Sequence, residues 1–366
     1  MVKQTSAIFI ALLGLNSAAA AQSPAPQSPA MQQALAARTC ELPKIAVTAP
    51  LEQISGSNLV SVPVTVNGAP QKFLLDIGMK RPTAVSPELM AKLGLPEAFR
   101  LTEPFLAGGS LGAGPFDTGN GFRVRVCDLG SGLGCSERDT RIRVSTFGIG
   151  DATGKHLQFA VAEKGEISSS APYDGFLSGD FLRKYDAELN FAGKQMTWLT
   201  PTSCTDPDQV VFWAHSDVAI IPVGLAKDGR LQMAAMVGGH AIYAEIDTSS
   251  PRTIMRRDIA ELYVGLKPGT ADMVPEGDLK DGMHLQINEH VFPQIIFAGG
   301  GVTALNVPVR IQSFSMRPSL SREQHLRGGL IPGERIPDLS IGMDVLRHLH
   351  MYVVPGQGKV YVTANE

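Results

Sequence analysis

The sequence lacks the features that mark several large classes of protein. Its 32 Lys and Arg residues do not outnumber its 35 Asp and Glu residues, and the net charge is −3, so the basic excess of a nucleic-acid-binding protein is missing. Charged residues make up only 18% of the chain and hydrophobic residues 44%, which excludes wholesale disorder. No Walker-type phosphate loop occurs, and no apolar run beyond the N-terminal region is long enough to span a bilayer. We therefore expect no nucleic-acid partner, no cofactor and no integral membrane segment once the N-terminal region is removed.

The length and composition indicate two compact domains. A chain of 366 residues is about right for two domains of ~150 residues each and a tail. Its hydrophobic fraction is sufficient for two packed cores. Glycine and proline, at 38 and 25 residues, exceed ordinary usage, which indicates many turns.

The N-terminal segment has the pattern of a secretory signal peptide. Lys3 gives a positive start, Ala7 to Leu15 is an apolar run too short to span a bilayer, and small residues follow up to Ala21. We expect residues 1–21 to be cleaved near Ala21, which predicts a periplasmic or secreted protein. A retained N-terminal anchor is the alternative. Residues 22–50 are rich in Pro and Ala and are predicted to form a spacer.

Few cysteines follow this segment, but their number is even. Cys127 and Cys135 flank a glycine-rich turn, which favours a short disulfide between them. Cys40 and Cys204 are then expected to link the start of the first half to its end. Four reduced, buried thiols are the alternative. Metal binding is less favoured, because no Cys-x-x-Cys motif exists.

The two halves of the chain repeat one pattern around an aspartate. Residues 60–66 alternate apolar and other residues as a half-buried strand does, and Asn67-Gly68 is a strong hairpin turn. An apolar strand then leads to Asp76. In the second half, residues 233–237 run into Gly238-Gly239, and a second apolar strand leads to Asp247. Each aspartate lies nine residues after the first residue of its turn.

The repeat continues beyond the aspartates. A glycine follows each by eighteen residues, and each is expected to end a short helix; Ser86 and Pro87 start the first of these helices as N-cap and first residue. Further on, each half has an apolar run, a glycine and then Asp-apolar-Leu-Arg. Its aspartate, Asp180 or Asp344, is predicted to cap another short helix, and a closing hairpin follows.

These spacings divide the mature chain into two homologous lobes. We expect an N-terminal lobe over residues 51–205, a linker over 206–217 that contains Asp-Pro-Asp, and a C-terminal lobe over 218–366. Each lobe is predicted to be mostly β with short helices. A pseudo-two-fold relation would place equivalent loops opposite each other.

On these motifs the chain resembles the retropepsin-like aspartic peptidases, specifically the bacterial aspartyl protease proteins. The resemblance implies an all-β fold with a few short helices, bilobal and pepsin-like in plan, made of two retropepsin-like lobes. It implies an aspartic endopeptidase in which Asp76 and Asp247 share a proton and activate a water. A polypeptide would be the substrate, and a monomer is expected, because both lobes lie in one chain. The matching stretches are VPVTVNGAPQKFLLDIG, SPELMAKLGL, DGFLSGDFLRKYDAELNF, AEIDTSS and IGMDVLRHLHMYV.

The aspartate loops depart from the family's Asp-Thr/Ser-Gly. In the first loop Ile77 precedes Gly78, so the hydroxyl is missing, and in the second Ser249 follows Thr248 in place of glycine. A buried Thr248 hydroxyl facing Ile77 is expected to lose a partner, at a cost of about 1–3 kcal/mol if nothing else satisfies it. Because of these departures a second function is also considered: the chain would be a catalytically degenerate relative of the peptidases that binds peptides or a protein partner.

Other candidate sites are weaker. Asp117-Thr118-Gly119 matches the family triplet, but it does not follow an apolar strand, and a surface turn or part of a flap is expected there. Zinc binding would need three ligands with matching geometry, and we expect no metal site. Arg183 and Arg347 are expected to be structural. The histidines considered for zinc are His284, His290, His348 and His350.

Overall fold

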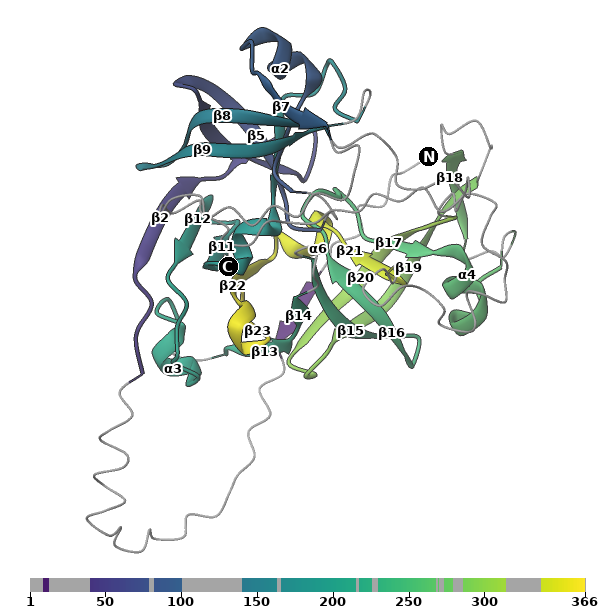
Figure 1. Ribbon diagram of the computed structural model, residues 1–366. Helices are drawn as coiled ribbons and strands as arrows, with labels where there is room; N and C mark the ends of the chain where they lie inside the picture. Colours follow the sequence, from purple (N-terminus) through teal and green to yellow (C-terminus); the bar gives the residue numbers. More distant parts are fainter. Residues whose placement is uncertain are drawn as a thin grey trace, which may run out of the picture.

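A computed structural model gives the fold of the chain (Figure 1). The structure describes residues 9–12, 40–78, 82–100, 140–162, 166–214, 217–225, 230–267, 269, 273–278, 286–313 and 337–365. The described chain is all-β with a few short helices, as the sequence predicts, and it is divided into two lobes.

A closed barrel of β-strands forms the first lobe. Strand β8 pairs back onto β4, with Val64 opposite Ile149, and this pairing closes the sheet. The short strands β3 (Glu52–Gln53) and β7 (Glu97–Arg100) extend it beside β4 and β8. In order around the barrel, the strands are β4 (Val60–Val66), β5 (Ala69–Asp76), β10 (Gly175–Ser178), β6 (Ala84–Val85), β9 (Ala152–Val161) and β8 (Thr140–Ile149).

The second lobe repeats this barrel strand for strand. Here β19 pairs with both β15 and β20, which closes the sheet. Strands β14 (Gly224–Leu225) and β18 (Val274–Asp278) extend it beside β15 and β19. In order, the strands are β15 (Leu231–Val237), β16 (His240–Ile246), β21 (Leu339–Ile341), β17 (Ile254–Arg256), β20 (Val302–Gln312) and β19 (Gln286–Phe297).

The chain crossover next to each aspartate strand is also the same in the two lobes. In the first lobe β10 is inserted between β5 and β6, parallel to β5 and antiparallel to β6. In the second, β21 is inserted between β16 and β17 with the same two directions. This agreement of pairing and direction confirms the internal repeat that the sequence spacing predicts.

A third sheet joins the lobes. In Figure 1 it lies between the first lobe at the top and the second at the right. At its centre β11 of the first lobe pairs with β22 of the second, with Glu188 opposite Tyr352. Strand β2 falls within the range predicted as spacer, and the short helix α3 (Pro207–Val210) falls within the predicted linker. In order, the strands are β13 (Ala219–Pro222), β23 (Lys359–Ala364), β22 (Leu349–Val354), β11 (Asp186–Asn190), β12 (Gln195–Leu199) and β2 (Ile45–Pro50).

Local sequence signals account for most turns and helix ends. Asn67 and Gly68 both have positive φ, which fits the tight β4–β5 hairpin. Helix α2 (Pro87–Lys92) begins as predicted, because the Ser86 hydroxyl accepts the Leu89 N–H at 2.9 Å. The equivalent helix of the second lobe starts as α4 (Arg257–Ile259) and widens into the π-helical turn η2 (Ala260–Val264). It ends at Gly265, whose φ is 76°.

The prediction that Asp180 and Asp344 are N-caps is wrong. The turn η1 (Gly179–Arg183) is capped by Ser178, and α6 (Met343–Leu346) begins after Gly342, so each aspartate lies inside its helical turn. Their carboxylates instead accept hydrogen bonds from threonines distant in the sequence, which are described below. The short turn η3 (Pro355–Gln357) closes the last hairpin.

The predicted link between Cys40 and Cys204 is present as a disulfide, with the two Cα atoms 4.8 Å apart. Cys204 is buried beside Tyr352 and Tyr361, under the sheet that joins the lobes. Cys127 and Cys135 lie outside the described residues, so their pairing stays a prediction.

The N-terminal region contributes one described strand. Strand β1 (Phe9–Leu12) pairs antiparallel with β20, with Phe9 opposite Leu305 and Leu12 opposite Val302. This strand lies within the predicted signal peptide, whose cleavage site at Ala21 lies outside the described residues. Among the described residues, no helix is long and apolar enough to cross a membrane.

Candidate functional site

The two repeated aspartates occupy equivalent places in the barrels. Asp76 is the last residue of β5, and it lies opposite Ser178 of the parallel strand β10. Asp247 directly follows β16, and its N–H bonds the carbonyl of Ile341, at the end of the parallel strand β21, at 3.0 Å. Each aspartate therefore ends a central strand at the chain crossover of its lobe.

The loops that follow the two aspartates touch across the lobes. A Cβ atom placed on Gly78 would lie 2.6 Å from Cα of Asp247 and 2.7 Å from its Cβ and Cγ. Real Cβ atoms do not approach so closely, so only glycine allows this contact. The first loop thus packs its backbone directly onto the second aspartate, which brings both predicted loops into one place.

A threonine hydroxyl joins the loops. The Thr248 hydroxyl accepts the Ile77 N–H at 2.9 Å and donates to the Leu75 carbonyl at 2.9 Å. These groups flank Asp76 in the chain. The expected loss of a partner for Thr248 is therefore wrong, because the hydroxyl bonds the main chain of the first loop and does not need a side-chain hydroxyl at position 77.

Ile77 itself belongs to the hydrophobic core. Its side chain is fully buried, in the same cluster as Phe73 and Leu75 of β5. A polar side chain here would exchange apolar packing for a hydroxyl in a buried position. The residue that departs from the peptidase pattern thus has a packing role, and the loop contact is held by Thr248 and Gly78.

One carboxylate oxygen of Asp247 accepts three hydrogen bonds. Its Oδ1 accepts hydrogen bonds from the Ser249 N–H at 3.0 Å, the Ser249 hydroxyl at 2.7 Å and the Ser250 N–H at 3.1 Å. Burial raises the pKa of Asp247, and these three hydrogen bonds act in the opposite direction. Ser249, which replaces the expected glycine, is thus a direct partner of the aspartate.

Behind each loop lies a threonine–aspartate pair that is repeated in both lobes. Thr83 gives its N–H and its hydroxyl to Asp180, both at 3.2 Å. Thr253 does the same to Asp344, at 3.0 and 2.8 Å. Burial raises the pKa of both carboxyl groups, and the threonine hydrogen bonds lower it.

The sequence analysis missed this pair, although a signal was present. The threonines follow Asp76 and Asp247 at nearly the same distance, and the second aspartates lie in the other repeated motif. Comparison of every polar residue between the repeats would have found both pairs.

A cross-lobe tie also involves one of the predicted structural arginines. Arg347 donates to the Asn58 side-chain oxygen at 2.9 Å, and the Asn58 amide donates to the Pro251 carbonyl at 3.1 Å. Arg347 therefore links the end of α6 to the first lobe. Arg183, its counterpart, lowers the pKa of Asp180 by its charge.

The described histidines that were considered as zinc ligands lie in different environments. His350 lies 2.9 Å from Glu188 and stacks on Trp213, with ring centroids 3.9 Å apart. Burial lowers the pKa of His348, and His290 packs its ring against Phe292. No group of three His, Cys, Asp or Glu residues able to hold a metal occurs within the described part of the chain. His284 and the Asp117-Thr118-Gly119 triplet lie outside that part.

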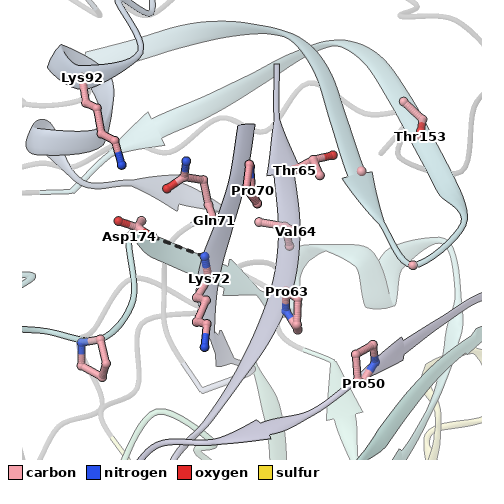
Figure 2. Close-up of a pocket in the computed structure, with 13 residues that line it drawn as sticks. Pro50, Pro63, Val64, Thr65, Pro70, Gln71, Lys72, Lys92, Thr153 and Asp174 are labelled. Carbon is pink, nitrogen blue, oxygen red and sulfur yellow. Dashed lines mark hydrogen bonds between the residues drawn. The ribbon is translucent and has the colours of Figure 1, made fainter. Parts of the chain in front are cut away.

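A cavity of about 630 Å³ lies away from the aspartate loops, against the β4–β5 hairpin of the first lobe. Figure 2 shows proline side chains and the charged residues Lys72, Lys92 and Asp174 around it, with the Lys72 N–H bonded to Asp174 at 3.3 Å. The cavity includes neither predicted aspartate.

No known family model matches the sequence, and no curated protein matches it. Among solved structures, basic 7S globulin from soybean is similar, with 11% identity and a TM-score of 0.44 over 88% of this chain and 96% of that chain. Conglutin gamma, a basic 7S globulin from lupine seeds, has 11% identity and a TM-score of 0.45 over the same shares.

The assignment to the retropepsin-like family is therefore wrong. No family model of these peptidases matches the sequence. Short motifs around the two aspartates produced the resemblance.

Proposed function

We propose that the two aspartate loops form a hydrolytic site and that the protein is an aspartic-type endopeptidase, independently of the rejected family. The observation that carries the proposal is the contact of the loops: Gly78 packs on Asp247, and Thr248 bonds both residues that flank Asp76. Two carboxyl groups on loops held in this way are expected to share one proton and to hold a water between them.

The proposed chemistry follows from an unequal pair. At acid pH the pair is expected to hold one proton, and its protonated member would polarise the scissile carbonyl. Its charged member would be the general base that activates the water. The titration belongs to the pair, so both roles depend on both residues.

A polypeptide is the proposed substrate, and a pepsin-like arrangement is the proposed finer description of the fold. Two barrel lobes on a shared sheet, with loops meeting between them, would accept an extended chain that adds as a strand. We also propose that the protein acts as a monomer after export to the periplasm or the outside, in line with the signal-peptide pattern.

Cleavage of a mixed peptide library at acid pH tests the activity. The wild type should cleave, and Asp76→Asn and Asp247→Asn should each reduce the rate by at least about a thousandfold, since either change removes one member of the pair. Asp258→Asn is the matched control, because Asp258 is an exposed aspartate outside both loops. Cleavage that survives Asp247→Asn would refute the site assignment.

A second function, peptide binding without catalysis, is favoured by one observation. Three donors from Ser249 and Ser250 converge on a single oxygen of Asp247, which gives this carboxylate a role in capping its own loop. If the wild type cleaves no peptide yet binds library peptides in calorimetry, and Gly78→Ala weakens that binding, the binding function replaces the peptidase.

A further inference from the structure

The two aspartate strands differ sharply two residues before the aspartate. In the first lobe Leu74 lies there, packed with Phe176 and the half-buried Leu59 in an apolar cluster. In the second lobe the same register positions hold Glu245, Ser340 and Arg230. The strand pairings establish this equivalence, because Leu74 and Glu245 occupy matching places opposite β4 and β15.

These polar residues form a buried bonded group. Arg230 donates to Oε2 of Glu245 at 2.8 Å, and Ser340 donates to Oε1 at 3.3 Å. Arg230 is 1% exposed and Glu245 6% exposed, so the pair is almost entirely removed from water. A buried ion pair is rarely more stabilising than a well-packed apolar group of similar size, which is what the first lobe has. We therefore expect the Arg230–Glu245 pair to have a role other than stabilising the fold.

Its position relative to Asp247 indicates that role. Residues two apart on a strand point to the same face, so Glu245 and Asp247 share a face of β16 and its extension. Tyr243 shares it too, while the residues paired with Glu245 on β15 and β21 are the uncharged Gln232 and Ser340. The charges that act on Glu245 are those of Arg230 and Asp247.

The two carboxyl groups are electrostatically coupled. Burial raises the pKa of Glu245 to about 7, Arg230 lowers it, and the charge of Asp247 raises it. Coupling between two titrating sites is reciprocal, so ionisation of Glu245 must act on Asp247 by the same amount. Below about pH 7 Glu245 is neutral, and above it Glu245 carries a negative charge that acts on Asp247.

We propose that Glu245, held by Arg230 and Ser340, is a positioning residue that makes the charge of the Asp247 loop respond to pH, whereas the apolar counterpart in the first lobe leaves the Asp76 loop without this response. The inference deepens the proposed function and rests on it, because it assumes that Asp247 has a chemical role. Glu245 gives the two similar loops different electrostatic surroundings, and this difference is a reason for Asp76 and Asp247 to have unequal roles.

Carbon-13 NMR of the Asp247 carboxyl group in the full chain tests the coupling without any substrate. In the wild type the chemical shift of this carbon should follow the titration of Asp247 and should show a second inflection near pH 7 from Glu245. Glu245→Gln should lose that inflection, since a glutamine side chain does not titrate. A variant that copies the first lobe, Arg230→Leu with Glu245→Leu and Ser340→Phe, should lose it as well and remain folded. Absence of the inflection in the wild type, or its persistence in Glu245→Gln, would overturn the proposal.

Peptide cleavage separates this inference from the proposed function. The rates of wild type and Glu245→Gln should agree below pH 6 and diverge above pH 7, while Asp258→Asn follows the wild type throughout. Superimposed profiles of an active wild type and Glu245→Gln would reject the positioning role. If no form cleaves peptides and the second inflection is present, the peptidase is refuted and the coupling stands.

Discussion

The Thr248 hydroxyl lies 2.9 Å from the main-chain nitrogen of Ile77 and is the acceptor of its hydrogen bond across the two lobes. The same hydroxyl donates to the Leu75 carbonyl. One second-lobe side chain thus satisfies two buried main-chain groups of the first lobe. We infer that the lobes depend on Thr248 for the mutual placement of their aspartate loops.

Thr248→Val should therefore destabilise the protein by about 3 kcal/mol, because it leaves a buried donor and a buried acceptor without this partner. Thr248→Ser keeps the hydroxyl and should cost less than about 1.5 kcal/mol. The free energies of unfolding in urea provide the measurement. Equal losses in the two variants would mean that the methyl group, and not the hydroxyl, is what position 248 requires.

Gly78→Ala should separate the loops. Its new Cβ would meet main-chain and side-chain atoms of Asp247 that cannot move independently of β16, so a cost of about 1–3 kcal/mol is expected. Gly224→Ala is the control, because nothing lies within 4 Å of a Cβ at that glycine. Melting temperatures of the two variants test this, and a Gly78→Ala protein as stable as the control would contradict the close packing of the loops.

The repeat and the strands were predictable because they depend on local pattern and spacing, whereas the disulfide between Cys40 and Cys204 was inferred from the pairing expected for the other two cysteines. Alternation fixes which strand residues are buried, and a turn such as Asn67-Gly68 sets the hairpin. Duplication of these signals then gives two lobes. Each of these inferences needs only residues near one another in the sequence, or an equal spacing between copies.

The site details were not predictable, since they depend on contacts between distant segments. The partners of Asp180 and Asp344 come from other elements, and an isolated Asp before a helical turn has the same local pattern as an N-cap. The Thr248 bond goes to main-chain atoms, which any residue at position 77 provides. The family resemblance failed for a related reason, because short motifs can agree where the intervening chain does not.

The disulfide between Cys40 and Cys204 should contribute strongly to stability. It links residues 164 positions apart, and closing so long a loop restricts the unfolded chain. Replacing both cysteines by serine should lower the free energy of unfolding by roughly 2–5 kcal/mol. Urea unfolding of the double variant, compared with wild type before and after reduction, provides the test. An oxidised wild type no more stable than the double variant would contradict the expected role of this link.

A buried acid in the sheet between the lobes should make stability depend on pH. Asp186 is 1% exposed and accepts hydrogen bonds from the Thr202 N–H at 2.9 Å and the Tyr352 hydroxyl at 3.3 Å. Burial raises its pKa to about 6 from an ordinary 3.8, and the two hydrogen bonds only partly oppose this. The folded state therefore holds the proton more tightly than the unfolded state. The stability that this group contributes is fully present below pH 3.8 and is lost as the pH rises through 6.

Asp186→Asn should remove that dependence. The difference in unfolding free energy between variant and wild type should grow in favour of the variant by about 2.4 kcal/mol from pH 4 to pH 7, which is somewhat less than the full effect of the shift because pH 4 lies just above the ordinary pKa. The contributions of the other titrating groups to the pH dependence of the unfolding free energy cancel in this difference, because both proteins contain these groups. Urea unfolding at pH 4, 5, 6 and 7 gives the measurement, with Asp258→Asn, which removes an exposed carboxylate, as the control. A constant difference for Asp186→Asn as well would mean that Asp186 titrates in the folded protein as it does in the unfolded chain.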